Sequence, residues 1–341
     1  MNHSTCAPFR TAAILAGLCL VGSSLAADAP PTTPPPTTAA PKWAPGTNRY
    51  IQNQLSDYGP FETATFPHGE AALSVYISTA KMTAGRPAVE KWIDDAASAV
   101  SHFYGHFPVP KATLVLLASG RDGVSGGVTY SGRLIRMKIG PGTDADEFKC
   151  DWTLTHEMFH LAFPDLDEEH LWVEEGMAVY FEPLARARVG NLSDEETWKG
   201  MVEGMENGQP ESGDRGLDNT HTWGRTYWGG AMFWFLADLR IRQATGNKHS
   251  ADDVLRAVLK DHGDGSQHWE MSDVIAAADK ATGTRVFTDL YAEAATKPMT
   301  ANLPALWKSL GVSVHGRKVI FDDTAPLAAI RKSLTDPKQN P

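Results

Sequence analysis

Short stretches of alternating hydrophobic and polar residues occur in the first half of the chain. Residues 71–78 and 134–139 carry apolar side chains at every second position, which is the period of a strand with one buried face. Residues 113–118 form a continuous apolar run, which predicts an interior strand. Together the three stretches predict a mixed β-sheet within residues 49–150.

One helix is predicted to cover this sheet. Apolar residues recur at helical spacing from Val89 to Phe103, Pro87 suits the first turn of a helix, and Gly105 suits its end. The glycine-rich residues 123–127 lack the spacing of a phosphate-binding loop, so we predict no nucleotide site there.

After Cys150 the hydrophobic spacing becomes helical. Ser193 and Glu196 match a capping box that opens a helix expected to end near Gly208. The most apolar helix is predicted over residues 226–244. The other elements expected here are short helices from about Ser250, Ser272 and Leu303, a strand at 318–321 and a last helix at 326–334.

The predicted fold class is α+β. Residues 49–150 form an N-terminal mixed β-sheet subdomain with its covering helix, and residues 151–341 form a mainly helical subdomain. A chain of 341 residues is long enough for either one large or two modest domains to bury a sizeable core.

The first residues match an export signal. Arg10 supplies a positive charge, residues 11–22 form a short apolar core, and the small residues around Ala26 allow cleavage after Ala26 or Ala27. Residues 27–48 are rich in proline, threonine and alanine, which predicts a disordered linker. The sequence therefore predicts a signal peptide at residues 1–26 and a periplasmic or secreted protein.

Charge and hydropathy narrow the possible partners. The chain carries 31 basic and 41 acidic residues, a net charge of −10, without a dense basic run. Nucleic acid and anionic membrane surfaces are therefore not expected as main partners. No stretch after the signal is long enough to cross a bilayer, so no transmembrane segment is expected in the mature chain.

The cysteines predict a protein without an internal disulfide. Cys6 and Cys19 leave with the signal peptide, which makes Cys150 the one cysteine of the mature chain. We interpret Cys150 as a buried structural thiol rather than as a catalytic nucleophile.

The strongest candidate site is the sequence HEMFH at residues 156–160. On a helix, His156 and His160 share one face, where both imidazoles can reach one metal ion, and Glu157 flanks that ion. Apolar neighbours such as Phe159 indicate a buried helix, and Pro164 ends the pattern soon afterwards. These features favour a zinc hydrolase over two surface histidines.

A zinc hydrolase needs a third protein ligand and an open position for water. The metzincin pattern fails, because its glycine and third histidine would fall at Phe163 and Leu166. Downstream carboxylates are the remaining candidates. They are Asp165, Asp167, Glu168 and Glu169 in a loop that we interpret as solvated, Glu174 and Glu175 at the start of an apolar and therefore buried helix, and Glu182.

HEMFH followed by WVEEGMAVY at residues 172–180 resembles the gluzincin metallopeptidases, in particular the M1 and M61 aminopeptidase-type families. The resemblance implies a thermolysin-like catalytic subdomain. It also implies that Glu175, directly before the glycine, is the third ligand of a single Zn²⁺ ion held by His156 and His160. Fourteen residues separate His160 from Glu175, fewer than is typical of M1 aminopeptidases, which implies a shortened loop between the helices.

The resemblance extends to RTYWGGA at residues 225–231. In M1 peptidases a Tyr-x-x-Gly segment opens a later helix, and its tyrosine stabilises the oxyanion, which maps onto Tyr227. His221 and Arg225 lie close to Tyr227 in sequence and are candidates either for substrate contacts or for surface roles.

One feature of the M1 aminopeptidases is missing. These enzymes carry an upstream Gly-x-Met-Glu-Asn segment whose glutamate holds the substrate amine, whereas this chain has GGVTY at residues 126–130. Gly126, Gly127 and Val128 supply no carboxylate, but they can offer a backbone edge along which a peptide lies. Aminopeptidase and endopeptidase action therefore both remain open.

The sequence predicts an exported zinc-dependent peptidase. Peptide or protein substrates would be hydrolysed by a zinc-activated water with Glu157 as general base, and Tyr227 would stabilise the oxyanion. The alternative is a catalytically silent, zinc-containing peptide-binding or scaffold protein of the periplasm. The oligomeric state is left open.

Overall fold

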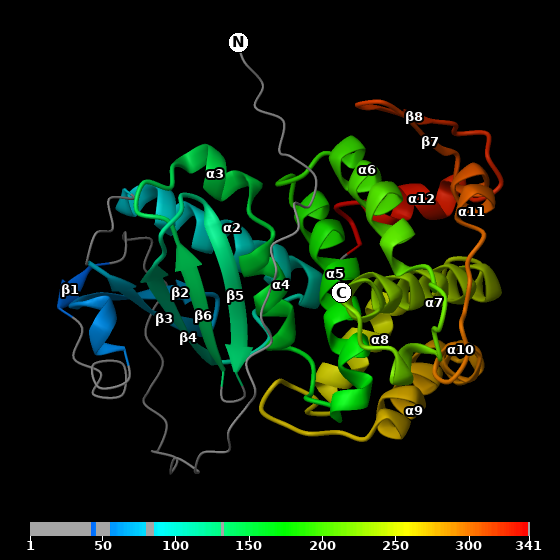
Figure 1. The fold of residues 1–341 in the computed structure, drawn as a ribbon, viewed down its shortest axis with the longest axis horizontal. Helices are drawn as coiled ribbons and strands as arrows, with labels where there is room; N and C mark the ends of the chain where they lie inside the picture. The colour runs from blue at the N-terminus through cyan, green and yellow to red at the C-terminus, as the bar shows by residue number, and fades with distance from the viewer. Residues whose placement is uncertain (1–41, 46–54, 80–84, 131–132, 340–341) are drawn as a thin grey trace.

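The computed structural model describes residues 42–45, 55–79, 85–130 and 133–339. The predicted signal peptide and most of the predicted linker lie outside these residues. The described part places a β-sheet on one side and a mainly helical region on the other (Figure 1). Within these four ranges, no helix combines the length and the apolar character needed to cross a membrane.

The sheet has six strands in the order β1-β2-β3-β4-β6-β5. Strands β3, β4 and β6 run parallel, and β5 pairs antiparallel with β6. The sheet is therefore mixed, as predicted, and β5 forms one of its two edges. The strands are β1 Ala44–Pro45, β2 Phe61–His68, β3 Ala71–Ser78, β4 Lys111–Ala118, β5 Val124–Tyr130 and β6 Leu134–Ile139.

Helix α2, Arg86–Tyr104, belongs to the same hydrophobic core as this sheet. Its Val89 and Val100 are fully buried, like Val75 of β3 and Leu116 of β4. The helix ends at Gly105, whose φ of 80° lies in the left-handed region that favours glycine. The helix predicted with Pro87 in its first turn and Gly105 at its end is therefore present.

The helical region begins after the sheet and contains a second small sheet near the C-terminus (Figure 1). Its longest helices, α5 and α7, pack against each other at its centre. The elements are α3 Ala145–Cys150, α4 Thr153–His160, η2 Glu168–His170, α5 Leu171–Arg188, α6 Asp194–Met205, η3 Glu206–Gly208, η4 Leu217–Asn219, η5 Gly224–Gly229, α7 Gly230–Thr245, α8 Ala251–Lys260, α9 Met271–Thr282, α10 Val286–Ala294, α11 Leu303–Leu310, β7 Val312–His315, β8 Lys318–Phe321 and α12 Ala328–Leu334. A short 3₁₀ turn, η1 Ser56–Tyr58, precedes β2.

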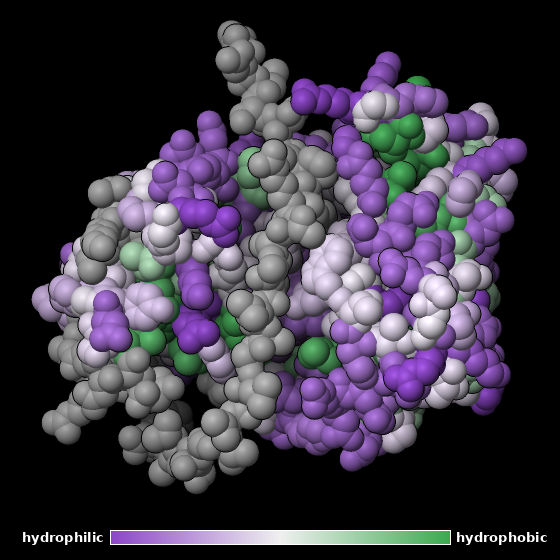
Figure 2. All heavy atoms as spheres, in the orientation of Figure 1, coloured by the Kyte–Doolittle hydropathy of each residue, from purple (hydrophilic) through white to green (hydrophobic). Residues whose placement is uncertain are grey.

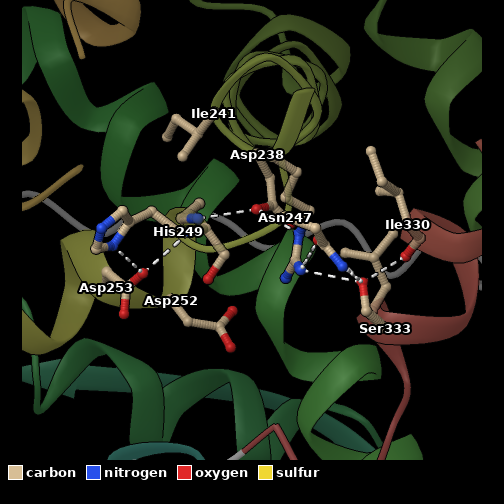
Figure 3. Close-up of polar contacts among 12 residues, drawn as sticks. Asp238, Ile241, Asn247, His249, Asp252, Asp253, Ile330 and Ser333 are labelled. Carbon is tan, nitrogen blue, oxygen red and sulfur yellow. Dashed lines mark hydrogen bonds and ion pairs between the residues drawn. The ribbon is translucent and has the colours of Figure 1, made fainter. Parts of the chain in front are cut away.

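A buried polar network ties the C-terminal helices together (Figure 3). The Asp238 carboxylate on α7 accepts hydrogen bonds from the Tyr180 hydroxyl at 2.8 Å, the Ala251 N–H at 2.8 Å and Arg242 Nε at 2.9 Å. Arg242 Nη1 also donates to Ser333 Oγ on α12 at 3.1 Å. The two charged side chains of this network are therefore buried and paired, as buried charges must be.

The folded part begins earlier than predicted. Strand β1 at residues 44–45 pairs with β2, and Trp43 Nε1 donates a hydrogen bond to Glu90 Oε1 on α2 at 2.7 Å. The Trp43 ring also packs edge to face against Phe66. Residues 42–45 therefore do not belong to the linker predicted over residues 27–48, because one tryptophan anchors a segment that composition alone assigns to solvent.

Cys150 also differs from its prediction, because it is disulfide-bonded. The prediction of a structural thiol in a protein without an internal disulfide is therefore wrong.

Candidate metal centre

Helix α4 carries the HEMFH sequence through the interior of the protein. Seven of its eight residues are buried, and His156 is 2% exposed. The Asp151 carboxylate accepts hydrogen bonds from the Thr153 and Leu154 N–H groups, each at 3.0 Å, which satisfies two free donors at the start of the helix. The helix is thus held in place before its histidines are reached.

Helices α4 and α5 bring two imidazoles and one carboxylate together. Glu175 Oε2 on α5 lies 3.1 Å from His156 Nε2 and 3.6 Å from His160 Nε2. The two Nε2 atoms lie 3.3 Å apart. One ligand atom from each of the three residues therefore lies within 4.8 Å of the other two, a separation that one metal ion can bridge.

The electrostatics of this cluster favour a cation. Burial alone lowers the pKa of His160, but the Glu175 carboxylate outweighs it and raises that pKa to about 9. Burial also opposes the ionisation of Glu175, but hydrogen bonds and charge from His156 and His160 hold its pKa well below its usual range. Since the attraction that favours a proton here also favours a divalent ion, two imidazoles and one carboxylate fit a catalytic zinc site.

A contact between two glycines places Tyr227 beside this cluster. A Cβ atom on Gly176 of α5 would lie 2.2 Å from the Gly230 carbonyl carbon, and one on Gly230 would lie 1.9 Å from the Trp172 carbonyl oxygen. Only glycine permits this approach between α5 and α7. Residues 224–229, directly before α7, form the π-helix η5, a form that often occurs at functional sites.

The Tyr227 ring stacks on His156, with the ring centroids 6.4 Å apart and the planes 20° from parallel. Burial and the negative charge of Glu175 and Glu157 raise the pKa of Tyr227 above its usual range. The phenol therefore stays protonated at neutral pH and can donate a hydrogen bond.

Strand β5 runs alongside Glu157. The Thr129 hydroxyl lies 2.7 Å from Glu157 Oε2 and 2.8 Å from the Glu157 carbonyl oxygen. A Cβ atom on Gly127 would lie 2.7 Å from Glu157 Cγ, so glycine is needed for this close approach. Burial raises the pKa of Glu157, which moves this carboxyl toward the range in which it can exchange a proton.

Glu174, the neighbour of Glu175, faces a different partner. Its Oε1 accepts a hydrogen bond from the Leu166 N–H at 2.9 Å. Burial raises the pKa of Glu174 to about 8, although the bond from Leu166 opposes this shift. Of the two glutamates in the first turns of α5, Glu175 therefore faces His156 and His160, whereas Glu174 binds the loop after α4.

The other predicted substrate residues lie in three different settings. Gly126, Gly127 and Val128 lie on the edge strand beside Glu157. His221 is exposed, in the segment before η5. Arg225 is 3% exposed, and its Nε lies 2.7 Å from Asp214 Oδ2, so it faces a buried carboxylate rather than a substrate.

Thr129 was not among the site residues predicted from sequence. Its contact with Glu157 crosses 28 positions of the chain. In a strand, Gly127 and Thr129 lie on the same face because they are two positions apart. A glycine beside a polar residue on one face was the pattern from which the sequence could have indicated this contact.

Comparison with known proteins gives a fold relationship. The sequence matches no protein-family model and no curated protein. An aminopeptidase N family protein from Idiomarina loihiensis has a similar structure, with a TM-score of 0.60 and 16% identity, over 75% of this chain and 50% of that one. An M1 zinc metallopeptidase from Deinococcus radiodurans gives a TM-score of 0.47 and 17% identity, over 72% of this chain and 54% of that one.

At this level of identity the similarity establishes the fold alone. The chain shares its fold with part of the Idiomarina loihiensis structure. It spans about half the length of the two structures that it matches. The roles of individual residues rest on the geometry described above.

Proposed function

We propose that this protein is a zinc-dependent peptidase of the gluzincin type, similar to the M1 and M61 families. His156, His160 and Glu175 hold one zinc ion, and Glu157 is the general base. The observation that carries the proposal is the convergence of these three ligand atoms within 4.8 Å beside the buried Glu157 carboxylate. Export to the periplasm or beyond, directed by residues 1–26, is part of the same proposal.

The chemistry divides between the ion and the chain. A zinc ion held by His156, His160 and Glu175 would supply Lewis-acid chemistry that makes water a stronger acid and nucleophile. The Glu157 carboxylate takes the proton of the attacking water and returns it to the leaving amine. The Tyr227 hydroxyl donates a hydrogen bond to the oxyanion of the tetrahedral intermediate, a contribution of about 3 kcal/mol for comparable donors.

Strand β5 provides the proposed binding edge for the peptide. It is the last strand of the sheet, and the Thr129 contact places it against α4. An extended peptide can pair with such an edge through its main chain, which aligns its carbonyl groups without selecting a sequence. The small side chains of Gly126 and Gly127 leave room for this approach.

Hydrolysis of a peptide library, with and without a chelator, tests the proposal. We expect cleavage that stops on chelation and about one zinc ion per chain. Using substrates with blocked and free N-termini in parallel distinguishes endopeptidase from aminopeptidase action.

Glu157→Gln should keep the zinc ion and reduce kcat by about 10²–10⁴-fold, because the base is lost while the ligands remain. Glu168→Gln, at an exposed position in the loop after α4, is the matched control and should retain activity. Full activity in Glu157→Gln would remove the proposed base. A wild-type chain that binds zinc but hydrolyses no peptide would instead be the silent scaffold protein.

A further inference from the structure

Large apolar side chains are rarely exposed in the described part of the chain. Among the residues that the structure describes, those exposed are Leu171 at 39%, Trp223 at 40% and Ile320 at 45%. Figure 2 shows that hydrophilic and intermediate residues cover most of the helical region on the face in view. An exposed tryptophan is notable here, because Trp172, Trp198 and Trp234 are almost completely buried.

Two of these three residues lie beside the proposed catalytic cluster. Leu171 and Glu175 are four residues apart on α5, so their side chains lie on the same face about 6 Å apart. Trp223 precedes Tyr227 by four residues, and the two rings stack with centroids 6.2 Å apart and planes 25° from parallel. Since Tyr227 stacks in turn on His156, Trp223 continues the aromatic column outward from the cluster.

We propose that Leu171 and Trp223 form an apolar shelf that binds a bulky apolar side chain of the peptide substrate next to the scissile bond. This inference rests on the proposed function and adds a substrate class to it. The shelf selects peptides with a large aliphatic or aromatic residue at that position over peptides with a small or charged one. Main-chain pairing along β5 holds the peptide, and the shelf supplies the preference for its side chain.

The physical basis is the burial of apolar area on both partners. An exposed tryptophan loses apolar contact with water when a phenylalanine or leucine side chain covers it, and aromatic pairs add a further attraction. A charged side chain on the same surface would lose hydration without gaining an ionic partner from Leu171 or Trp223. This favourable free energy contributes to both binding and turnover when the substrate side chain that covers the shelf adjoins the reacting bond.

The test compares matched peptides that differ at one position. Three peptides carry Phe, Ala or Lys beside the scissile bond, and kcat/KM is measured for each with the zinc-loaded wild-type chain. We expect the Phe peptide to exceed the Ala and Lys peptides by roughly tenfold or more. The measured quantity is the ratio of kcat/KM for the Phe peptide to kcat/KM for the Ala peptide. The substitution Trp223→Ala should bring this ratio close to one, and Leu171→Ala should reduce it in part. Trp223→Phe should keep most of the ratio.

Ile320→Ala is the matched control, because Ile320 is equally exposed but lies on β8, in the C-terminal hairpin. It should leave the ratio unchanged. An equal preference in wild type and Trp223→Ala, or a wild-type preference for Lys or Ala, would overturn the shelf.

A binding measurement separates this inference from the proposed function. Fluorescence anisotropy of labelled Phe and Ala peptides with the Glu157→Gln chain reports the shelf without turnover. A tighter Kd for the Phe peptide that disappears in Glu157→Gln/Trp223→Ala supports the shelf even if the wild-type chain hydrolyses nothing. Equal Kd values for the two peptides contradict the shelf, whether or not peptides are hydrolysed.

Discussion

The Thr129 hydroxyl lies within hydrogen-bonding distance of both the backbone carbonyl and the carboxylate of Glu157. At the end of α4 the Leu161 N–H donates to the Met158 carbonyl at 3.3 Å, which leaves the Glu157 carbonyl available to the Thr129 hydroxyl. The same hydroxyl lies 2.7 Å from the Glu157 carboxylate. One side chain from the sheet therefore orients the proposed base.

Replacing this hydroxyl should impair turnover more than binding. Thr129→Val keeps the shape of the side chain and removes its hydrogen bond, so we expect about a tenfold lower kcat with little change in KM or zinc content. Steady-state kinetics and metal analysis on the purified variant provide the measurement.

Thr129→Ser is the control, because it keeps the hydroxyl and loses only a methyl group. Thr129→Ser should therefore keep most of the kcat that Thr129→Val loses. If valine and serine lower kcat equally, the effect is one of packing and Thr129 does not position the base.

The residues that could be predicted from sequence are those whose relation is local. His156 and His160 share a face of any helix, so their pairing follows from spacing alone. The place of Glu175 depended on a family resemblance, because the residues left several carboxylates as candidates. Thr129 could not be found in this way, since its contact exists only when β5 lies against α4.

The contact between α5 and α7 allows a test of how the cluster is held together. In Gly176→Ala the new methyl group would meet backbone atoms of Gly230, which cannot rotate away. We expect a loss of about 2 kcal/mol in the free energy of unfolding, together with weaker zinc binding, because the helix that carries Glu175 must move. Denaturant unfolding and zinc titration measure the two effects.

Gly120→Ala is the matched control, because a Cβ atom there meets nothing within 4 Å. It should unfold like the wild type. Equal stability of the Gly176→Ala and Gly120→Ala chains would show that the two helices can separate without loss.

Asp218 joins several elements and gives the fold a pH dependence. Its carboxylate faces His170 Nδ1 at 3.1 Å and accepts from Trp172 Nε1 at 2.8 Å and from the Tyr291 hydroxyl at 2.8 Å. The hydrogen bond to Asp218 raises the pKa of His170 above 6.5. Burial opposes the ionisation of Asp218, but these three bonds hold its pKa below 3.8.

The signs of these shifts define a window of greatest stability. Protonated His170 stabilises the fold fully below pH 6.5, and this contribution is lost as the pH rises through its raised pKa. Ionised Asp218 contributes above pH 3.8, and its contribution is lost as the pH falls through its lowered pKa. We therefore expect this cluster to stabilise the fold most between about pH 4 and pH 6.5.

Unfolding midpoints at about pH 5.5 and about pH 8.5, with a chelator in both buffers, test this window. The wild-type midpoint should fall between these two values of pH, and His170→Gln should reduce the fall. A fall of the same size in both chains would assign the pH dependence to other groups.

The elements predicted from sequence are those with strong local periodicity. Strand β3 and helix α2 follow from alternation and from helical spacing, and the capping box before α6 is present as expected. The glycines of strand β5 carry no hydrophobic pattern, so the sequence predicted only a backbone edge at residues 126–128 and not the bounds of the strand. The same glycines permit β5 to approach α4. The π-helix before α7 depends on tertiary packing, which spacing does not record.

At the scale of the whole molecule, a buried ion pair connects two helices that are distant in sequence. Arg188 on α5 lies 2.7 Å from Asp252 on α8, with both side chains fully buried. A second buried pair, between Arg242 and Asp238, lies within α7. Removing one member of such a pair leaves the other charge in the interior without compensation.

Two arginines on α7 provide a direct comparison. Arg242→Ala should lower the free energy of unfolding by about 3–5 kcal/mol, because Asp238 keeps its burial and loses its ionic partner. Arg240→Ala removes an exposed ion pair with Glu293 and should change the free energy of unfolding by about 1 kcal/mol or less. Denaturant unfolding of both chains measures the difference, and similar losses would contradict a stabilising role for the buried network.

The hydrogen bond from Thr129 of the sheet to Glu157 has a practical consequence for purified protein. All three proposed zinc ligands belong to α4 and α5, whereas the orientation of the base depends on a strand of the opposite layer. Molecules in which the sheet has shifted relative to α4 can therefore hold their full complement of zinc and yet have no catalytic activity. Zinc content would count such molecules as intact, so the active fraction has to be determined as turnover per bound zinc ion.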